Sequence, residues 1–331
     1  MYFSAAGKTT TRYIVPTSKK YLSRNISDSK EAVLLPVNPQ RVVTTSSTYI
    51  AVLQALQLLD RLKGVNEAPF ICNQNIQRKL KQGEIVNLGG DGFFDIEKLL
   101  HIQADLMLQS AYETEGSVIQ QQIRQSNIPC VLIRDYDEQH PLARAEWMIY
   151  IAAFFNEEKK AMALFQASAQ EYIRLRNELD SCKLKRPVVI CNLPWNDVWY
   201  MPGKDAYMTR LIRDAGASHP WEQEERNNSL NISLNYEQVF LKGQHAAFWL
   251  HPNSAISLGE VSRSLPQAVH FTAFANGKVY NNNRIRTMAG GNDFWESGVI
   301  FPHLILKDLM ALFHPQFFPQ HRLKYYEKLS P

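Results

Sequence analysis

Long apolar runs are missing from this 331-residue sequence. No stretch reaches the roughly 18 apolar residues that a membrane-spanning helix needs, so the sequence predicts no such helix. Clustered basic residues are missing too, because 36 Lys and Arg against 32 Asp and Glu give a formal net charge of only +4. This mild excess suits an anionic ligand in a pocket and argues against nucleic-acid binding.

Cysteine and histidine are sparse and scattered. The four cysteines show no metal-ligand spacing, and Cys130 and Cys191 fall inside apparent strands, where a buried thiol is expected. No three histidines have the spacing of a zinc site. We therefore assign no metal-binding residue.

The common catalytic motifs are also missing. There is no Gly-x-Gly-x-x-Gly after a strand, no phosphate loop, no Gly-x-Ser-x-Gly and no His-Glu-x-x-His. The glycine-rich stretches 89–92 and 289–292 fit no phosphate template and are interpreted as tight turns. We assign no catalytic residue, and the sequence does not predict an enzyme.

What the chain does contain is a short helix–strand unit that occurs twice. Asp95 can cap a helix, Glu97 lies in its first turn, and the apolar run ending at Leu108 suits a buried strand. Adding 140 to each number gives Asn235, Glu237 and Phe248, which repeat the pattern without a gap. One unit used twice predicts two lobes of similar build.

Strands alternate with helices along most of the chain, which predicts an α/β fold of two doubly wound lobes. Apolar residues at helical spacing between about 157 and 179 predict one long helix that joins the lobes rigidly. The expected divisions are an N-terminal arm (1–38), an N-terminal lobe (39–156), the connecting helix (157–182) and a C-terminal lobe (183–331).

Aromatic and cationic residues recur in the turns that follow the predicted strands. Rings can grip a large flat or apolar ligand, and arginines can pair with its carboxylates. The alternative is that each ring simply packs its own loop, but recurrence at one sheet edge in both lobes favours a pocket. The candidate ligand-binding residues are Tyr49, Phe93, Phe94, Tyr112, Trp195, Tyr200, Arg284, Asn292 and Trp295.

Several segments carry a family resemblance. Residues 96–108, their counterparts 236–250, and the stretch 271–280 are similar to the substrate-binding proteins of ABC importers for iron complexes and corrinoids. The segments 141–147 and 199–203 resemble a subgroup of the same proteins. The resemblance covers about residues 39–314.

This resemblance implies a ligand cleft between two lobes, little hinge motion, and one docking glutamate per lobe facing arginines of an ABC permease dimer. The matching residues are Glu97 and Glu237. The alternative is that both are ordinary first-turn acids that favour the helix dipole. The resemblance further implies a periplasmic, lipid-anchored monomer whose signal segment is absent from this chain.

The resemblance leaves the ligand open. An anionic ferric siderophore would use Arg210, Arg284 and Arg286, whereas haem or cobalamin would use the rings, and haem would also want an axial donor such as Tyr49 or Tyr112. An iron complex is expected first and a corrinoid second, with no intrinsic cofactor. Two further classes stay open: a two-domain nucleotide-sugar enzyme of the glycosyltransferase type, and a scaffold or sensor.

Overall fold

The computed structural model describes residues 12–14, 32–36, 38–90, 93–111, 123, 125–181, 185–224 and 230–331. The chain forms two compact units. The N-terminal unit comprises Met1–Asp135 and Glu146–Leu164, and the C-terminal unit comprises Tyr136–Ala145 and Phe165–Pro331.

The N-terminal unit is built on a five-stranded parallel sheet with the strand order β5-β4-β3-β8-β9. Its strands are β3 (Val42–Thr44), β4 (Leu62–Val65), β5 (Val86–Asn87), β8 (Leu106–Ser110) and β9 (Cys130–Ile133). The central strands β3 and β8 are buried almost throughout, as expected for a parallel sheet covered on both faces. Two short pairs stand apart: β1 (Arg12–Ile14) with β2 (Ala32–Leu34), and β6 (Gly89–Gly90) with β7 (Phe93–Phe94).

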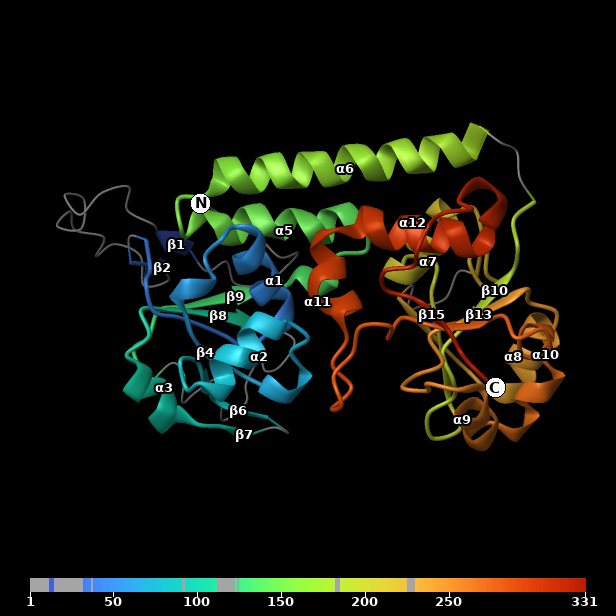
Figure 1. Cartoon of the computed structure of the whole chain (residues 1–331), viewed down its shortest axis with the longest axis horizontal. Coiled ribbons are helices and arrows are strands. Elements are labelled where there is room, and N and C mark those ends of the chain that lie inside the picture. Colours follow the sequence, from blue (N-terminus) through green and yellow to red (C-terminus); the bar gives the residue numbers. More distant parts are fainter. Residues whose placement is uncertain are drawn as a thin grey trace. The chain divides into compact units, whose positions relative to one another are not determined.

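Among the described residues, three complete helices connect the strands of this sheet (Figure 1). They are α1 (Ser47–Ala55), α2 (Gln74–Lys81) and α3 (Ile96–Ile102), with single 3-10 turns at Leu59–Arg61 and Ala68–Phe70. A further 3-10 turn, Asp135–Asp137, contributes residues to both units. Each of the three helices begins after a polar residue whose side chain accepts a backbone N–H of the first turn: Ser46, Asn73 and Asp95.

Two longer helices contribute residues to both units. They are α5 (Pro141–Ala153) and α6 (Glu158–Ser181). The 24 residues of α6 run without a break in Figure 1, a length of about 36 Å at 1.5 Å per residue. The long helix expected from the sequence is confirmed.

The C-terminal unit contains a four-stranded sheet with the order β10-β13-β14-β15. The strands β10 (Val189–Cys191), β13 (Phe248–Leu250) and β14 (Val279–Asn281) are parallel, and β15 (Glu327–Lys328) is antiparallel to β14. A separate antiparallel pair joins β11 (Trp199–Pro202) to β12 (Asn231–Leu234). Burial raises the pKa of the Cys191 thiol in β10 to about 12, consistent with the inert cysteine expected there.

The helices of this unit are α7 (Tyr207–Asp214), α8 (Tyr236–Gly243), α9 (Leu258–Ser264), α10 (Thr272–Ala275), α11 (Asp293–Ile300) and α12 (Pro302–Phe313), with 3-10 turns at Pro266–His270 and Pro315–Phe317. Helices α7 and α12 pack together (Figure 1). Part of the core of this unit is aromatic. The Trp199 ring stacks on the Trp249 ring with 5.6 Å between their centroids, and the Phe271 ring contacts both.

A buried carboxylate fixes the end of the chain. The Asp308 side chain on α12 is fully buried and accepts from His321 Nε2 at 2.6 Å and from the backbone N–H groups of Lys324 and Tyr325 at 2.9 and 2.7 Å. These bonds hold the segment that supplies β15 and the buried Tyr326.

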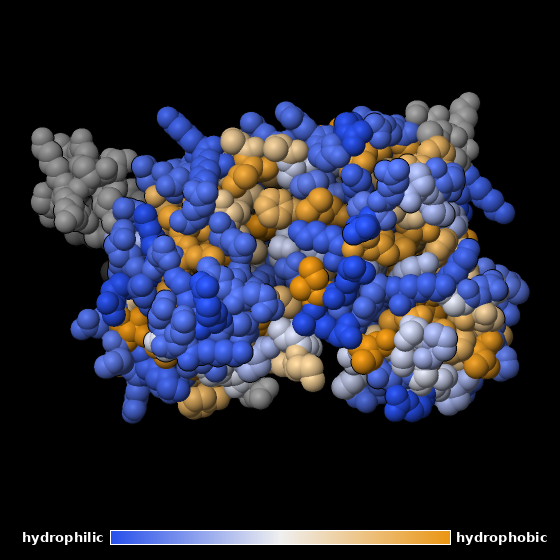
Figure 2. Space-filling view, viewed as in Figure 1, coloured by the Kyte–Doolittle hydropathy of each residue, from blue (hydrophilic) through white to orange (hydrophobic). Residues whose placement is uncertain are grey.

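The mixed α/β fold with a parallel sheet, expected from the sequence, is confirmed. Hydrophilic residues cover most of the surface visible in Figure 2, with smaller hydrophobic patches between them. Within the part of the chain that the structure describes, no helix is both long and apolar enough to cross a membrane.

Candidate ligand-binding site

Ligands of open parallel sheets bind outside the carboxyl ends of the strands, where the strand order reverses. In the N-terminal unit this point lies between β3 and β8, because the chain builds β4 and β5 on one side of β3 and then returns to the other. The Thr45 hydroxyl oxygen accepts from Ser110 N at 3.0 Å, and the Ser46 hydroxyl caps α1 by accepting from Thr48 N at 3.3 Å. These hydrogen bonds make the carboxyl edge between β3 and β8 polar and hold its backbone in place.

Asn66 follows β4 at the same edge and was not singled out from the sequence. Its backbone N–H donates to Thr44 O at 3.1 Å, continuing the sheet by one residue. Its side-chain Oδ1 is buried and has no hydrogen-bond partner in the structure. A buried acceptor without a partner costs about 1 to 3 kcal/mol, so a ligand donor at this position would be favoured. An asparagine directly after a short apolar strand is the one sequence signal that could have found it.

Two rings predicted to bind ligand are instead core residues. Only 1% of the Tyr49 side chain is exposed, and its hydroxyl donates to Asp135 Oδ1 at 3.0 Å. Phe94 is buried against Leu88 and Leu99. Burial leaves neither ring with surface to offer a ligand, so neither enters the site proposed below. Tyr112 lies outside the described residues.

Phe93 is 64% exposed and stands on the hairpin formed by β6 and β7. The hairpin requires glycine at position 89, where φ is +139° and an added Cβ would come within 2.3 Å of Phe93 O. The turn expected at 89–92 thus begins as a short paired strand, and Asp91 and Gly92 lie outside the described residues.

In the C-terminal unit, two buried indoles fix the loop that follows β10. Trp199 Nε1 donates to Cys191 O at 2.8 Å, and Trp249 Nε1 donates to Asn192 O at 2.7 Å. Asn192 itself has a φ of 63°, which turns the chain away from the strand. The loop therefore leaves the carboxyl edge in one defined direction.

This loop presents Trp195, which is 67% exposed. Trp195 and Val198 exchange both backbone hydrogen bonds, at 2.8 and 3.0 Å, and the two residues between them, Asn196 and Asp197, have φ values of 46° and 62°. Positive φ at both central positions is the signature of a tight hairpin turn, for which asparagine and aspartate are suited. Tyr200, another predicted ligand residue, is also exposed.

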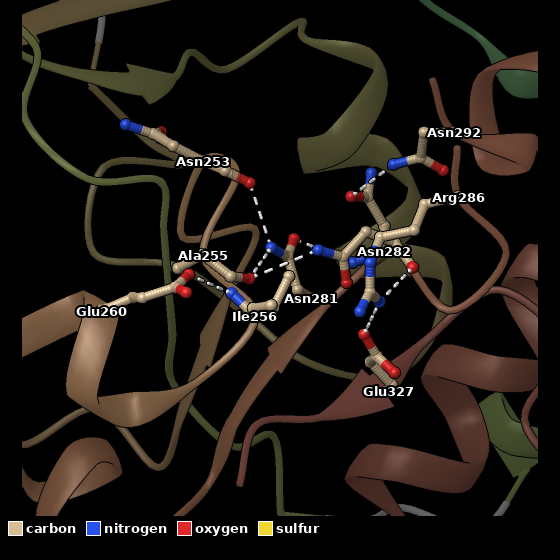
Figure 3. Close-up of polar contacts among 10 residues, drawn as sticks. Asn253, Ala255, Ile256, Glu260, Asn281, Asn282, Arg286, Asn292 and Glu327 are labelled. Carbon is tan, nitrogen blue, oxygen red and sulfur yellow. Dashed lines mark hydrogen bonds and ion pairs between the residues drawn. The ribbon is translucent and has the colours of Figure 1, made fainter. Parts of the chain in front are cut away.

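A network of amides lies at the carboxyl end of β14 (Figure 3). Asn281 Nδ2 donates to Asn253 O at 3.0 Å and to Ala255 O at 2.8 Å, tying β14 to the loop after β13. Asn292 Nδ2 donates to Asn282 Oδ1 at 3.0 Å. These bonds hold the loop 284–292 against the strand end.

The next residue, Asn283, is the incomplete member of this network. Its Nδ2 donates to Ala255 O at 3.3 Å, whereas its Oδ1 is buried without a partner in the structure. Only 7% of Asn283 is exposed. Like Asn66 in the other unit, it offers an unused acceptor at a carboxyl edge.

The structure gives the polar residues of the loop 284–292 different roles. Arg286 is paired with Glu327 and donates to Asn283 O at 3.0 Å, so it holds the loop. Asn292 caps α11 by accepting from Phe294 N at 2.9 Å. Arg284 is exposed, and its guanidinium has no ion-pair partner among the residues that the structure describes.

Trp295, in the first turn of α11, belongs to a cluster that the sequence pattern does not reveal. The Arg144 guanidinium lies 5.6 Å from the Tyr207 ring and 5.7 Å from the Trp295 ring, and the two ring centroids are 6.1 Å apart. Such cation–π contacts hold a charge and two rings together at low cost. Trp295 stays 39% exposed.

The buried histidines are neutral packing groups. Burial lowers the pKa of His251 to about 3, and its Nε2 shares a hydrogen bond of 2.8 Å with the Tyr326 hydroxyl. Burial, with a contribution from Arg213, lowers the pKa of His219 to about 4. Among the described residues no group of three His, Cys, Asp or Glu side chains is placed to hold a metal ion.

The two predicted docking glutamates occupy matching positions. Glu97 lies in the first turn of α3 and Glu237 in the first turn of α8. Both are exposed, and neither has an ion-pair partner within the described ranges. Their role in docking stays a prediction.

Comparison with known proteins gives a consistent result. A protein of Methanocaldococcus jannaschii described as an uncharacterized lipoprotein is 24% identical over 96% of this chain and 78% of its own length. Among solved structures, a periplasmic haem-binding protein of Pseudomonas aeruginosa has a TM-score of 0.65 at 14% identity, covering 88% of this chain and 99% of that one. An Fe3+-hydroxamate transport protein of Saccharomonospora viridis has a TM-score of 0.60 at 16% identity, covering 83% and 93%.

At these identities the solved structures establish the fold alone. The sequence match is more specific: residues 42–283, from the first strand of the N-terminal sheet to the amide network after β14, match the periplasmic binding protein family. This range covers well over half of the chain and includes both copies of the repeated helix–strand unit. The chain is therefore a member of the periplasmic binding protein family, whose members bind substrates for transport, as its motifs predict.

Proposed function

We propose that this protein is the substrate-binding component of an ABC importer and that its ligand is an iron complex. The observation that carries the proposal is that the exposed Arg284 directly follows Asn283, whose buried Oδ1 has no partner, at the carboxyl edge of the C-terminal sheet. An exposed guanidinium next to an unused amide oxygen suits an anionic ligand that also carries N–H or O–H donors. An anionic ferric siderophore, such as a ferric catecholate, has this chemistry.

Exposed rings extend the proposed surface. Trp195 lies on the loop after β10, and Trp295 lies in the first turn of α11 beside the Arg144 guanidinium. These rings would contact the apolar parts of a chelate, and they also suit the flat face of haem. The first choice is a ferric siderophore, because the charge and the hydrogen-bond acceptor at this edge suit it, and because Tyr49, one of the two donors considered for haem iron, is buried and bonded to Asp135. The other donor, Tyr112, lies outside the described residues.

Ligand titration tests the proposal. Ferrichrome, ferric enterobactin, haemin and cyanocobalamin would be titrated into the full chain by isothermal calorimetry, with quenching of the exposed tryptophans as a second readout. We expect one ferric siderophore to bind with a Kd of roughly 1 μM or below, the range of specific small-ligand sites. Binding of haemin with a Soret shift, or of cyanocobalamin alone, would replace the siderophore with a tetrapyrrole.

We further propose that Glu97 and Glu237 dock the protein onto a permease dimer from the periplasmic side, with a lipid anchor keeping it there. Two exposed carboxylates at equivalent helix starts can steer and register a partner that carries arginines. The relative described as a lipoprotein supports the anchor. Labelling of intact cells with a membrane-impermeant reagent tests the location, and protein labelled only after lysis would refute it.

The enzyme alternative, a nucleotide-sugar transferase, has a direct test. Calorimetry with UDP-glucose and an assay for released UDP should both be blank. Binding together with turnover would overturn the transport proposal, whereas a blank result in the ligand panel and in this assay would favour the scaffold or sensor.

A further inference from the structure

The C-terminal unit contains a cavity of about 700 Å³ at the opposite edge of its sheet from the candidate site. Val188 and Lys278 line it, and they directly precede β10 and β14, while Phe248 begins β13. All three strands run parallel, so these residues mark the amino edge. The volume lies in the range of small-molecule sites.

The cavity has an aromatic wall. Phe248 lies 6.2 Å from Tyr280 and 5.2 Å from Phe313 between ring centroids, and all three residues line the cavity. The three rings come from β13, β14 and the end of α12, so the sheet and the helix fix them together. A wall of this kind contacts a planar apolar body well.

The cavity is also one-sided in charge. Lys185, Arg186 and Lys278 line it together with His245 and His314, and no Asp or Glu is among the lining residues. Lys278 Nζ lies 5.0 Å from the centre of the Phe248 ring, so one ammonium is held directly against the aromatic wall.

One of these cations, Arg186, has a structural role at the carboxyl end of α7. Arg186 donates to Arg213 O in the last turn of α7 at 3.0 Å and to Ala217 O just after this helix at 2.7 Å, so its charge serves the carboxyl end of α7. Burial lowers the pKa of His314 below its ordinary value, so its ring does not add a charge at neutral pH. Lys185 and Lys278 have no carboxylate partner among the described residues, and they are the cations that no helix end explains.

We infer that this cavity is a second binding site, separate from the transport ligand, for a small organic anion with a planar apolar body. Lys185 and Lys278 would pair with its carboxylate or phosphate, and the rings of Phe248, Tyr280 and Phe313 would contact its flat part. Because the site lies within the C-terminal unit alone, it can be occupied whether or not a transport ligand is bound.

Three probes that share parts of one structure test the site on the full chain by calorimetry. They are 2-naphthoate, which has both the anion and the planar body, 2-naphthalenemethanol, which lacks the charge, and inorganic phosphate, which lacks the body. We expect 2-naphthoate to bind at least about tenfold more tightly than either, because the alcohol lacks the charged hydrogen bonds to the lysines and phosphate lacks the contacts with the aromatic wall. Equal binding of the alcohol or of phosphate would overturn the inference, and so would the absence of binding by 2-naphthoate.

Variants locate the binding. Lys278→Gln and Lys185→Gln should each weaken 2-naphthoate binding by about tenfold, and Lys278→Arg, which keeps the charge, should restore most of it. Lys159→Gln, which removes an exposed lysine on α6, is the matched control for the loss of one cation elsewhere, and Arg284→Gln reports whether 2-naphthoate occupies the candidate ligand site instead. If Arg284→Gln weakened binding and Lys278→Gln did not, the naphthoate would be in the candidate ligand site and the inference would be wrong.

Discussion

Asp95 and Asn235 cap equivalent helices in the same way, although they lie in different units of the chain. Asp95 Oδ1 accepts from the backbone N–H of Lys98 at 2.9 Å, and Asn235 Oδ1 accepts from that of Gln238 at 2.9 Å. The strand that follows each helix pairs in parallel with the first strand of its own sheet, β8 with β3 and β13 with β10. The repeated sequence unit is therefore also a repeated unit of topology.

The two caps should respond differently to pH. The hydrogen bond from Lys98 N to the Asp95 carboxylate, with a smaller contribution from the Lys98 ammonium, lowers the pKa of Asp95 below its ordinary value of 3.8. A lowered pKa in the folded state means that the carboxylate stabilises the fold at pH values above 3.8, and this contribution is lost as the pH falls through the folded pKa. Asn235 does not titrate.

We therefore expect the stability difference between wild type and Asp95→Asn to be constant from pH 7 to pH 5 and to change only below about pH 4. Asn235→Ala should cost about 1 kcal/mol at every pH. Urea unfolding followed by circular dichroism between pH 3 and pH 7 measures both. If the cost of Asn235→Ala also depended on pH, titration of the Asp95 cap would not be the cause of the pH dependence.

The docking proposal predicts a loss that is confined to the transporter. An exposed ion pair is worth about 0.2 to 1 kcal/mol, so the double variant Glu97→Ala with Glu237→Ala should weaken docking by roughly two- to thirtyfold. ATPase stimulation of the reconstituted permease should fall accordingly, with ligand affinity unchanged. Glu84→Ala removes another exposed glutamate and serves as the control. A change in ligand affinity would argue against a docking role.

Local features of the fold were predictable because they depend on residues close in the sequence. A cap needs only the residue before a helix and an N–H three positions later, which is why Asp95 and Asn235 could both be found. Helix α6 follows from apolar spacing within its own 24 residues. Parallel pairing of buried strands follows from their apolar runs and from the helices between them.

The candidate site was less predictable, because burial and contact depend on distant segments. Tyr49 follows a strand, as the exposed rings do, but its hydroxyl meets Asp135, 86 positions further along the chain, and the ring is buried. Arg144 lies in a segment with a family resemblance, yet nothing near it in sequence reveals that it meets Tyr207 and Trp295. The sequence can place Asn66 after a strand, but that the side-chain oxygens of Asn66 and Asn283 lack a hydrogen-bond partner follows only from the structure.

Asp308 should be the most costly polar residue to remove from the C-terminal unit. Asp308→Ala would remove the acceptor of three donors: the His321 ring and the backbone N–H groups of Lys324 and Tyr325. Losing one partner of such a buried group costs about 3 to 5 kcal/mol. His321→Gln, which removes only one donor, should cost less. Urea unfolding measures both, and equal small effects would mean that the chain end is held by apolar packing instead.

Arg284 and Tyr49 provide a sharp contrast for ligand binding, since both were predicted from the sequence but only one is exposed in the structure. Arg284→Gln should weaken the affinity for the ferric siderophore by about tenfold or more, because one charged hydrogen bond is lost, and it should not lower the stability of the fold. Tyr49→Phe should do the reverse: it removes the buried hydrogen bond to Asp135, which costs about 1 to 3 kcal/mol of stability, and leaves affinity unchanged.

Calorimetry with the siderophore and urea unfolding separate the two effects in the same pair of variants. Arg286→Gln is the matched control for the cation, because Arg286 lies in the same loop but is occupied by Glu327. Arg286→Gln should lower stability more than Arg284→Gln does, because Glu327 loses its ion-pair partner and Asn283 O loses its hydrogen-bond donor. If Tyr49→Phe weakened the ligand while Arg284→Gln did not, the carboxyl edge of the C-terminal sheet would not be the binding surface, and the buried hydroxyl would have to reach the ligand through a rearranged N-terminal unit.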